Sequence, residues 1–65
     1  MRGKRVIVSR PEGFLYDVRA VSEVYVDEDG VQRVQLCTEQ AYYRWMLCDV
    51  SPVVRNYPAH LVWVE

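Results

Sequence analysis

The sequence predicts an all-β domain, a small barrel of five strands with a short 3₁₀ turn before the last strand. Its apolar segments are short, rich in valine and tyrosine, and alternate with polar residues, as half-buried strands do. Turn residues separate these segments, and Asp29-Gly30 tolerates the positive φ angles of a tight hairpin. A chain of 65 residues has room for one domain, residues 1–65. The predicted strands are residues 4–8, 16–28, 31–38, 42–48 and 61–65.

The first three strands are predicted from alternation and from the turns between them. Val6 and Val8 share one face of the first strand, and the loop at residues 10–13 ends it because Pro11 donates no ladder hydrogen bond. Asp29-Gly30 turns the long second strand into the third. One face of the second strand carries Tyr16, Val18, Ala20, Ser22, Val24 and Val26.

The segment 38–49 has two interpretations. In a strand, Tyr43, Trp45 and Leu47 would face a core together. In a helix, Thr38 would be the N-cap and Glu39 would lie in the first turn. We favour the strand, because its density of aromatic residues suits a sheet. After a turn at residues 49–52, residues 55–59 predict one turn of 3₁₀ helix before the closing strand.

This order of elements resembles SH3-like barrels, in which the strands bend round one core and few edges stay exposed. Both ends of the chain also resemble photosystem I reaction-centre subunit IV, itself an SH3-like barrel of similar length. That resemblance implies an accessory photosystem subunit, and the segment 37–48 lies outside it. It rests on Arg2-Gly3, Val6, Val8, Arg10-Pro11-Glu12, Phe14, Tyr16 and Asn56-Tyr57-Pro58-Ala59-His60.

A second resemblance is to peptide-binding SH3 domains. Residues 14–17, Phe-Leu-Tyr-Asp, are similar to their alanine-leucine-tyrosine-aspartate-tyrosine motif. Asn56-Tyr57 is similar to their serine-asparagine-tyrosine motif, and Trp45 falls between the two. The resemblance implies a peptide ligand.

Charge and composition exclude several classes of function. The formal net charge of −1 argues against bulk electrostatic binding to nucleic acid, although the chain begins basic and then turns acidic. No stretch approaches the roughly 20 apolar residues of a membrane span, and residues 6–8 are too few for an export signal. We therefore expect a cytoplasmic protein in which Cys37 and Cys48 are free thiols.

The sequence predicts no catalytic residue, no metal ligand set and no cofactor. His60 is the only histidine, and no acid stands near it in sequence. The two cysteines lie eleven positions apart and form no metal motif. The carboxylates at positions 27–29 are three adjacent turn charges, whereas a calcium loop spaces its ligands over about 12 residues. An enzyme would need an oligomer that builds a site on a symmetry axis.

Aromatic residues are the candidates for binding. Eight of them are too many for one small core, and tyrosine and tryptophan supply much of the binding energy at interfaces. We expect a groove formed by Tyr16, Trp45 and Tyr57, with Phe14 beside it and acidic side chains around it. Such a groove would take an extended or proline-rich peptide with basic flanks.

The apolar content of the chain, 51%, predicts association with other molecules, because so small a domain cannot bury that much apolar surface. We expect a non-enzymatic protein-interaction or assembly module that forms a homo-oligomer. One alternative is a subunit similar to photosystem I subunit IV. Another is a small barrel that binds nucleic acid through its basic start and its aromatic residues.

Overall fold

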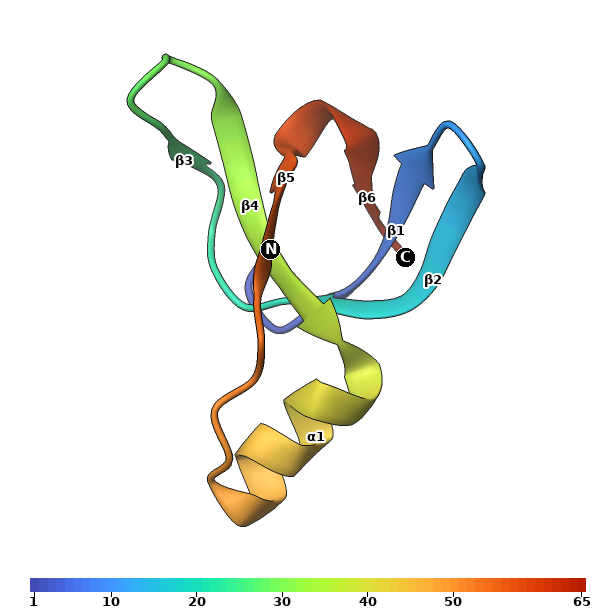
Figure 1. The fold of residues 1–65 in the computed structure, drawn as a ribbon, viewed down its shortest axis with the longest axis vertical. Coiled ribbons are helices and arrows are strands. Elements are labelled where there is room, and N and C mark those ends of the chain that lie inside the picture. The colour runs from blue at the N-terminus through green and yellow to red at the C-terminus, as the bar shows by residue number, and fades with distance from the viewer.

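Six strands curl into an antiparallel half-barrel, and one helix projects from it (Figure 1). A computed structural model describes all residues from 1 to 65. The strand order is β3-β4-β2-β1-β6, and β5 pairs with the other edge of β4. The elements are β1 (Arg5–Arg10), β2 (Gly13–Ala20), β3 (Tyr25–Val26), β4 (Gln32–Thr38), α1 (Glu39–Cys48), β5 (Arg55–Pro58), the 3₁₀ helix η1 (Ala59–Leu61) and β6 (Val62–Val64).

The core consists of side chains that alternate along the strands. Val6 and Val8, Val18 and Ala20, and Val34 and Leu36 are pairs two residues apart on β1, β2 and β4. Val62 of β6 completes this hydrophobic cluster. The predicted all-β class, the barrel-like curl and the 3₁₀ turn before the last strand are confirmed. Neither the length nor the apolar character of any helix in the structure would let it span a membrane.

The long second strand is broken into two pieces, β2 and β3. Residues 21–24 between them are not in a strand, because Ser22 uses its side chain where a strand would use its backbone. Its hydroxyl accepts from the Gln35 amide at 3.0 Å and donates to the Glu23 carbonyl at 2.9 Å. The chain bends at this point and returns to β4 as β3.

The hairpin predicted at Asp29-Gly30 is present. Gly30 has a φ of 80°, and Asp27 organises the turn by accepting from the amides of Asp29 and Val31, each at 2.9 Å. Hydrogen bonds hold the pKa of Asp27 below its usual value. The largest contribution is from the Arg33 side chain, and the second is from the Val31 amide. The turn is therefore fixed by a side chain as well as by glycine.

The strand predicted at residues 42–48 is wrong, and the alternative helix is correct. The Thr38 hydroxyl accepts from the Ala41 amide at 3.1 Å and so caps the first turn of α1. Asp49 ends the helix in the left-handed conformation, at φ 58°, and its amide donates to the Trp45 carbonyl. No residue of α1 is buried, so local capping outweighs the aromatic content that favours a sheet.

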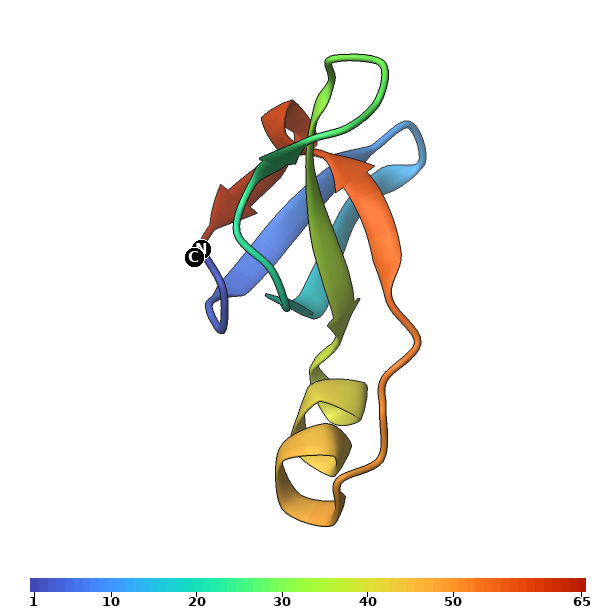
Figure 2. The same cartoon turned by 90° about the vertical axis from the view of Figure 1, so that its left-hand side faces the viewer.

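The last part of the chain also differs from the prediction. Arg55–Pro58 forms strand β5 on β4, and the 3₁₀ turn comes later, at Ala59–Leu61. Pairing with the free edge of β4 supplies backbone partners for residues 55–58 that an isolated helical turn would lack. Figure 2 shows the return segment that leads from the end of α1 up to β5.

Replacing Thr38 by alanine tests the capping argument. Thr38→Ala removes the acceptor for the Ala41 amide, so we expect a loss of about 1 kcal/mol in unfolding free energy and lower helical ellipticity. Urea unfolding followed by circular dichroism measures both. Thr38→Ser keeps the hydroxyl and should stay close to the parent protein. Equal losses for the two variants would contradict the role of the cap.

Candidate functional site

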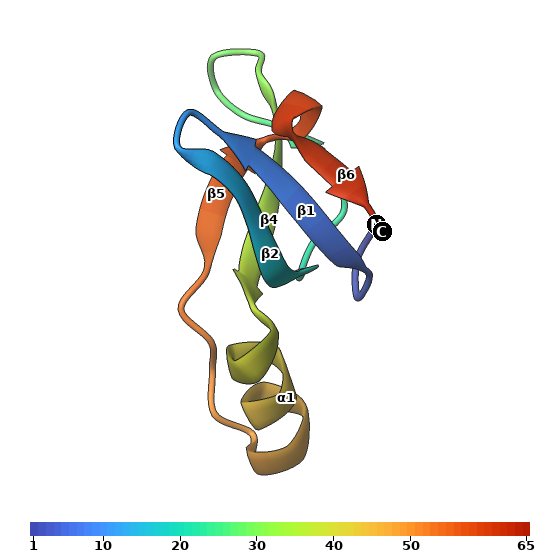
Figure 3. The ribbon, with the colours of Figure 1, turned by 90° about the vertical axis from the view of Figure 1, so that its right-hand side faces the viewer.

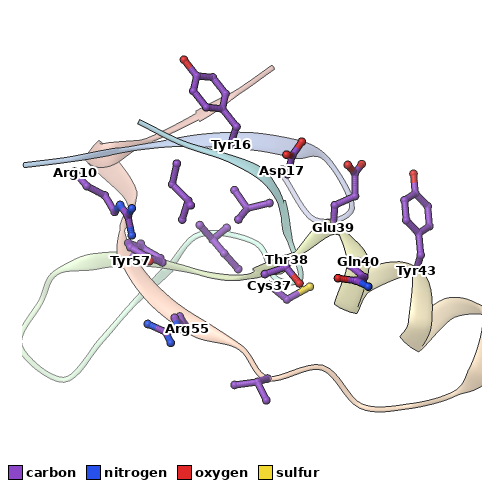
Figure 4. A pocket seen from close by; sticks show the side chains of 14 residues that line it. Arg10, Tyr16, Asp17, Cys37, Thr38, Glu39, Gln40, Tyr43, Arg55 and Tyr57 are labelled. Atoms are coloured by element: carbon purple, nitrogen blue, oxygen red, sulfur yellow. The ribbon is translucent and has the colours of Figure 1, made fainter. Parts of the chain in front are cut away.

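An open groove of about 840 Å³ lies on one side of the half-barrel, between β2, the end of β4, the start of α1 and the segment that enters β5 (Figure 4). Its floor includes Leu36 and Cys37, which are both buried. Tyr57 of β5 lies at one end, and Tyr43 of α1 lies at the other. The remaining lining residues are Arg10, Leu15, Tyr16, Asp17, Val18, Thr38, Glu39, Gln40, Val53 and Arg55.

The groove exists because β2 and β4 pair over a short distance. Val18, Arg19 and Ala20 pair with β4, whose strand ends at Thr38 where α1 begins. Residues 13–15 of β2 pair only with β1, and residues 16–17 pair with neither neighbouring strand, so the other edge of residues 13–17 has no strand beside it. β5 pairs only with β4. Two unpaired strand edges therefore border the groove; in Figure 3, β2 crosses in front of β4 and β5 runs beside β4.

A β-bulge shapes the wall formed by β2. Val8 pairs with Leu15 and Val6 pairs with Val18, so Tyr16 and Asp17 together lie opposite one residue of β1. The backbone of Asp17 accommodates the bulge by adopting the left-handed conformation, at φ 61°. Aspartate tolerates this conformation better than most residues do. In Figure 4, Asp17 points toward Glu39 of α1, and Tyr16 extends from the rim away from the other lining residues.

The carboxylates at the acidic end of the groove already have a cation of the protein beside them. Arg5 lies 3.2 Å from an Asp17 carboxylate oxygen and 3.4 Å from one of Glu39. Glu65, near the end of the chain, also contacts Arg5, at 3.3 Å. These two groove carboxylates thus have a cation of the protein beside them.

The basic end of the groove is less satisfied. Arg55 takes part in no ion pair in the structure. Arg10 Nε lies 3.0 Å from a Glu12 carboxylate oxygen, but the orientation gives no hydrogen bond, and this nitrogen is buried. Arg10 and Arg55 therefore retain donors that no group of the protein accepts.

Arg19 holds the start of α1 against the barrel. Its guanidinium donates to the Gly3 carbonyl at 2.8 Å, to a Glu39 carboxylate oxygen at 3.3 Å and to the Tyr43 hydroxyl at 3.0 Å. It also stacks over the rings of Tyr42 and Tyr43, 5.1 and 5.2 Å from their centroids. Burial alone would lower the pKa of Arg19, but contacts with Tyr43 and Glu39 raise it above its usual value.

Comparison with protein-family models, curated proteins and solved structures finds no match for this chain.

The structure separates the four residues predicted to form one binding groove. Tyr16 and Tyr57 both line the groove. Phe14 lies beside Tyr16, with ring centroids 6.3 Å apart, but is not a lining residue. Trp45 is on α1, packed edge-on against Tyr42 at 6.4 Å and outside the groove.

Sequence reasoning missed Arg10 and Arg55 as groove residues. Arg10 appeared only as part of a basic start, and Arg55 as part of a 3₁₀ turn. Recognising residues 55–58 as a strand would have placed Arg55 and Tyr57 two positions apart, on one face of a strand.

Few residues could take part in chemistry. No group of three or more histidine, cysteine, aspartate or glutamate residues in the structure could hold a metal ion. His60 is exposed on η1. Both cysteines are free, Cys37 buried at the groove floor and Cys48 exposed at the end of α1.

The two thiols should react at very different rates. Burial raises the pKa of Cys37 and shields its sulfur from reagents, whereas Cys48 is exposed. We expect one equivalent of iodoacetamide to label Cys48 in the folded protein and Cys37 to react only in denaturant. Peptide mapping by mass spectrometry identifies the labelled residue. Comparable labelling of both residues in the folded protein would contradict the buried position of Cys37.

Removing the Arg19 guanidinium should release α1. In Arg19→Gln we expect amide hydrogen exchange in α1 to accelerate on the order of tenfold, while β1 and β4 keep their protection. Arg44→Gln is the matched control. Arg44 lies on α1 itself, is exposed and has no ion pair, so its loss removes a charge without removing a contact to the barrel. The clamp model fails if exchange in α1 is the same in the two variants.

Proposed function

We propose that this protein is a non-enzymatic interaction and assembly module that associates with copies of itself. One observation carries the proposal: thirteen large hydrophobic side chains are exposed, whereas only eight residues in the whole chain are buried. Scattered single apolar residues are normal on a protein surface, but a concentration of them marks an interaction site.

The exposed side chains concentrate on an arm formed by α1 and the segment that follows it. Figures 1 and 2 show this arm extending beyond the half-barrel. Leu47 and Val53 are 81% and 82% exposed, more than any other large hydrophobic residue. The six exposed side chains of the arm are Tyr43, Met46, Leu47, Val50, Val53 and Val54.

Helical spacing supports one continuous surface on α1. Tyr43, Met46 and Leu47 lie three and four positions apart, so they share a face of the helix. A symmetric pair of arms would cover this face with the same face of a second copy, as two-fold dimers do. Burying it removes apolar surface from water, which is the main favourable term in association.

The test is mass as a function of concentration. Gel filtration with light scattering should give a mass above the 7.7 kDa of one chain, rising with protein concentration. Leu47→Glu places a charge at the centre of the arm and should return the protein to one chain. Val26→Glu is the control, since Val26 is 63% exposed but lies on β3. A single-chain mass for the parent protein at every concentration would refute the proposal.

Two finer assignments belong with this proposal. An SH3-like barrel is supported by the strand path, in which β2 and β3 together replace one long bent strand and η1 precedes β6. A role as a subunit similar to photosystem I subunit IV rests on the residues at the two ends of the chain. A photosynthetic source would support that role, and a non-photosynthetic source would end it.

Nucleic-acid binding is a weaker alternative, favoured by cations that the protein leaves unpaired. Arg2, Lys4, Arg44 and Arg55 make no ion pair in the structure. Binding through these cations would weaken steeply with salt concentration, because counterions are released on binding. A filter-binding titration that shows no retention at low salt would exclude this role.

A further inference from the structure

We propose that the groove binds an extended segment of a partner protein, which adds as a strand to the free edge of β2 and places an acidic side chain near Arg10 and Arg55. This inference goes beyond self-association, because it concerns a different partner and a groove that shares only Tyr43 and Val53 with the exposed side chains of the arm.

The backbone of β2 supplies the first part of the argument. Residues 13–15 pair with β1 on one side only, Tyr16 and Asp17 form the bulge, and none of the backbone hydrogen bonds outside the regular elements involves any of these five residues. Four of them, residues 13–16, precede the left-handed Asp17 and span about 13 Å at 3.3 Å per residue. Unpaired amides and carbonyls along such an edge are the template that strand addition uses.

The floor of the groove supplies the second part. Leu36 is 2% exposed, and Leu15 and Tyr57 are half-buried side chains that pack against the core. An added strand would direct alternate side chains onto this apolar floor. The groove volume of about 840 Å³ lies within the range of sites that enclose small ligands or short peptides.

The charge of the groove supplies the third part and decides the chemistry of the segment. Asp17 and Glu39 already have Arg5 beside them. A basic side chain of the ligand would have to compete with Arg5 for these carboxylates, so we do not expect one at this end of the groove. Arg55 has no carboxylate partner, and Arg10 has only the exposed carboxylate of Glu12, at 3.0 Å. A carboxylate of the segment would accept from Arg55 and would compete with Glu12 for the exposed part of the Arg10 guanidinium, and arginine suits such contacts. The basic flanks expected from the sequence are thereby replaced by an acidic side chain.

A defined peptide probe tests the proposal. The probe is the capped pentapeptide acetyl-Val-Thr-Val-Glu-Val-amide, titrated into ¹⁵N-labelled full-length protein and followed by amide chemical shifts. We expect shifts concentrated on residues 13–17 and 55–57 and slower hydrogen exchange at the β2 edge. Arg55→Gln should weaken binding by up to about fivefold, the upper end of the range for one exposed charge pair. Arg44→Gln should leave the affinity unchanged, because Arg44 does not line this groove.

Two matched peptides separate the parts of the argument without any protein variant. Replacing the glutamate of the probe by lysine should weaken binding at least as much as Arg55→Gln does. N-methylation of alternate backbone amides keeps the side chains but removes strand pairing, so that peptide should not bind. Undiminished binding of either peptide overturns the proposal, as does the absence of shifts at residues 13–17 at millimolar probe.

The outcome is distinguishable from that of the assembly proposal. Leu47→Glu changes the arm and leaves the groove residues in place. The probe should therefore bind this variant as it binds the parent protein. Loss of probe binding in Leu47→Glu, with the fold intact by circular dichroism, would assign the site to the assembled form and contradict a groove complete in one chain.

Discussion

The position of the helix depends mainly on the guanidinium of Arg19, with a further contact from Arg5 to Glu39. Because no side chain of α1 is buried, the core does not hold the helix in place. Arg19 joins three parts of the chain instead: the Gly3 carbonyl, Glu39 at the start of α1 and the Tyr43 hydroxyl one turn later. The same contact keeps Glu39 at the end of the groove, so the arm and the groove share one anchor.

The small size of the core leaves part of the barrel uncovered. Eight buried residues are enough to align β1, β2, β4 and β6, but not to cover the barrel on all sides. β4 ends at Thr38, where the chain departs into α1, and the edge of β2 stays open there. The groove and the exposed arm therefore have one structural cause: β4 ends at Thr38 and the chain continues as a helix rather than as a strand along β2.

The sequence predicts the parts of this fold that depend on alternation and turn chemistry. The alternation of Val6 and Val8 predicts that both are buried on one face of the first strand, as they are. The Asp29-Gly30 pair predicts the hairpin that the structure contains. The aromatic density of the segment after Thr38 favours a strand, because aromatic side chains suit a half-buried sheet. In the structure none of these residues is buried. The cap at Thr38 was visible in the sequence. The groove was harder to foresee, because Arg55 comes to line it only through the pairing of β5 with β4.

Cys48 has a practical value that follows from where it lies. It is exposed at the far end of α1, while the other thiol of the chain is shielded in the barrel. A fluorophore or nitroxide attached there would sit on the arm without any engineered mutation. Distances between two such labels would report the arrangement of associated copies, and their mobility would report how firmly the helix is anchored. The native chain thus carries its own spectroscopic attachment point where assembly would be observed.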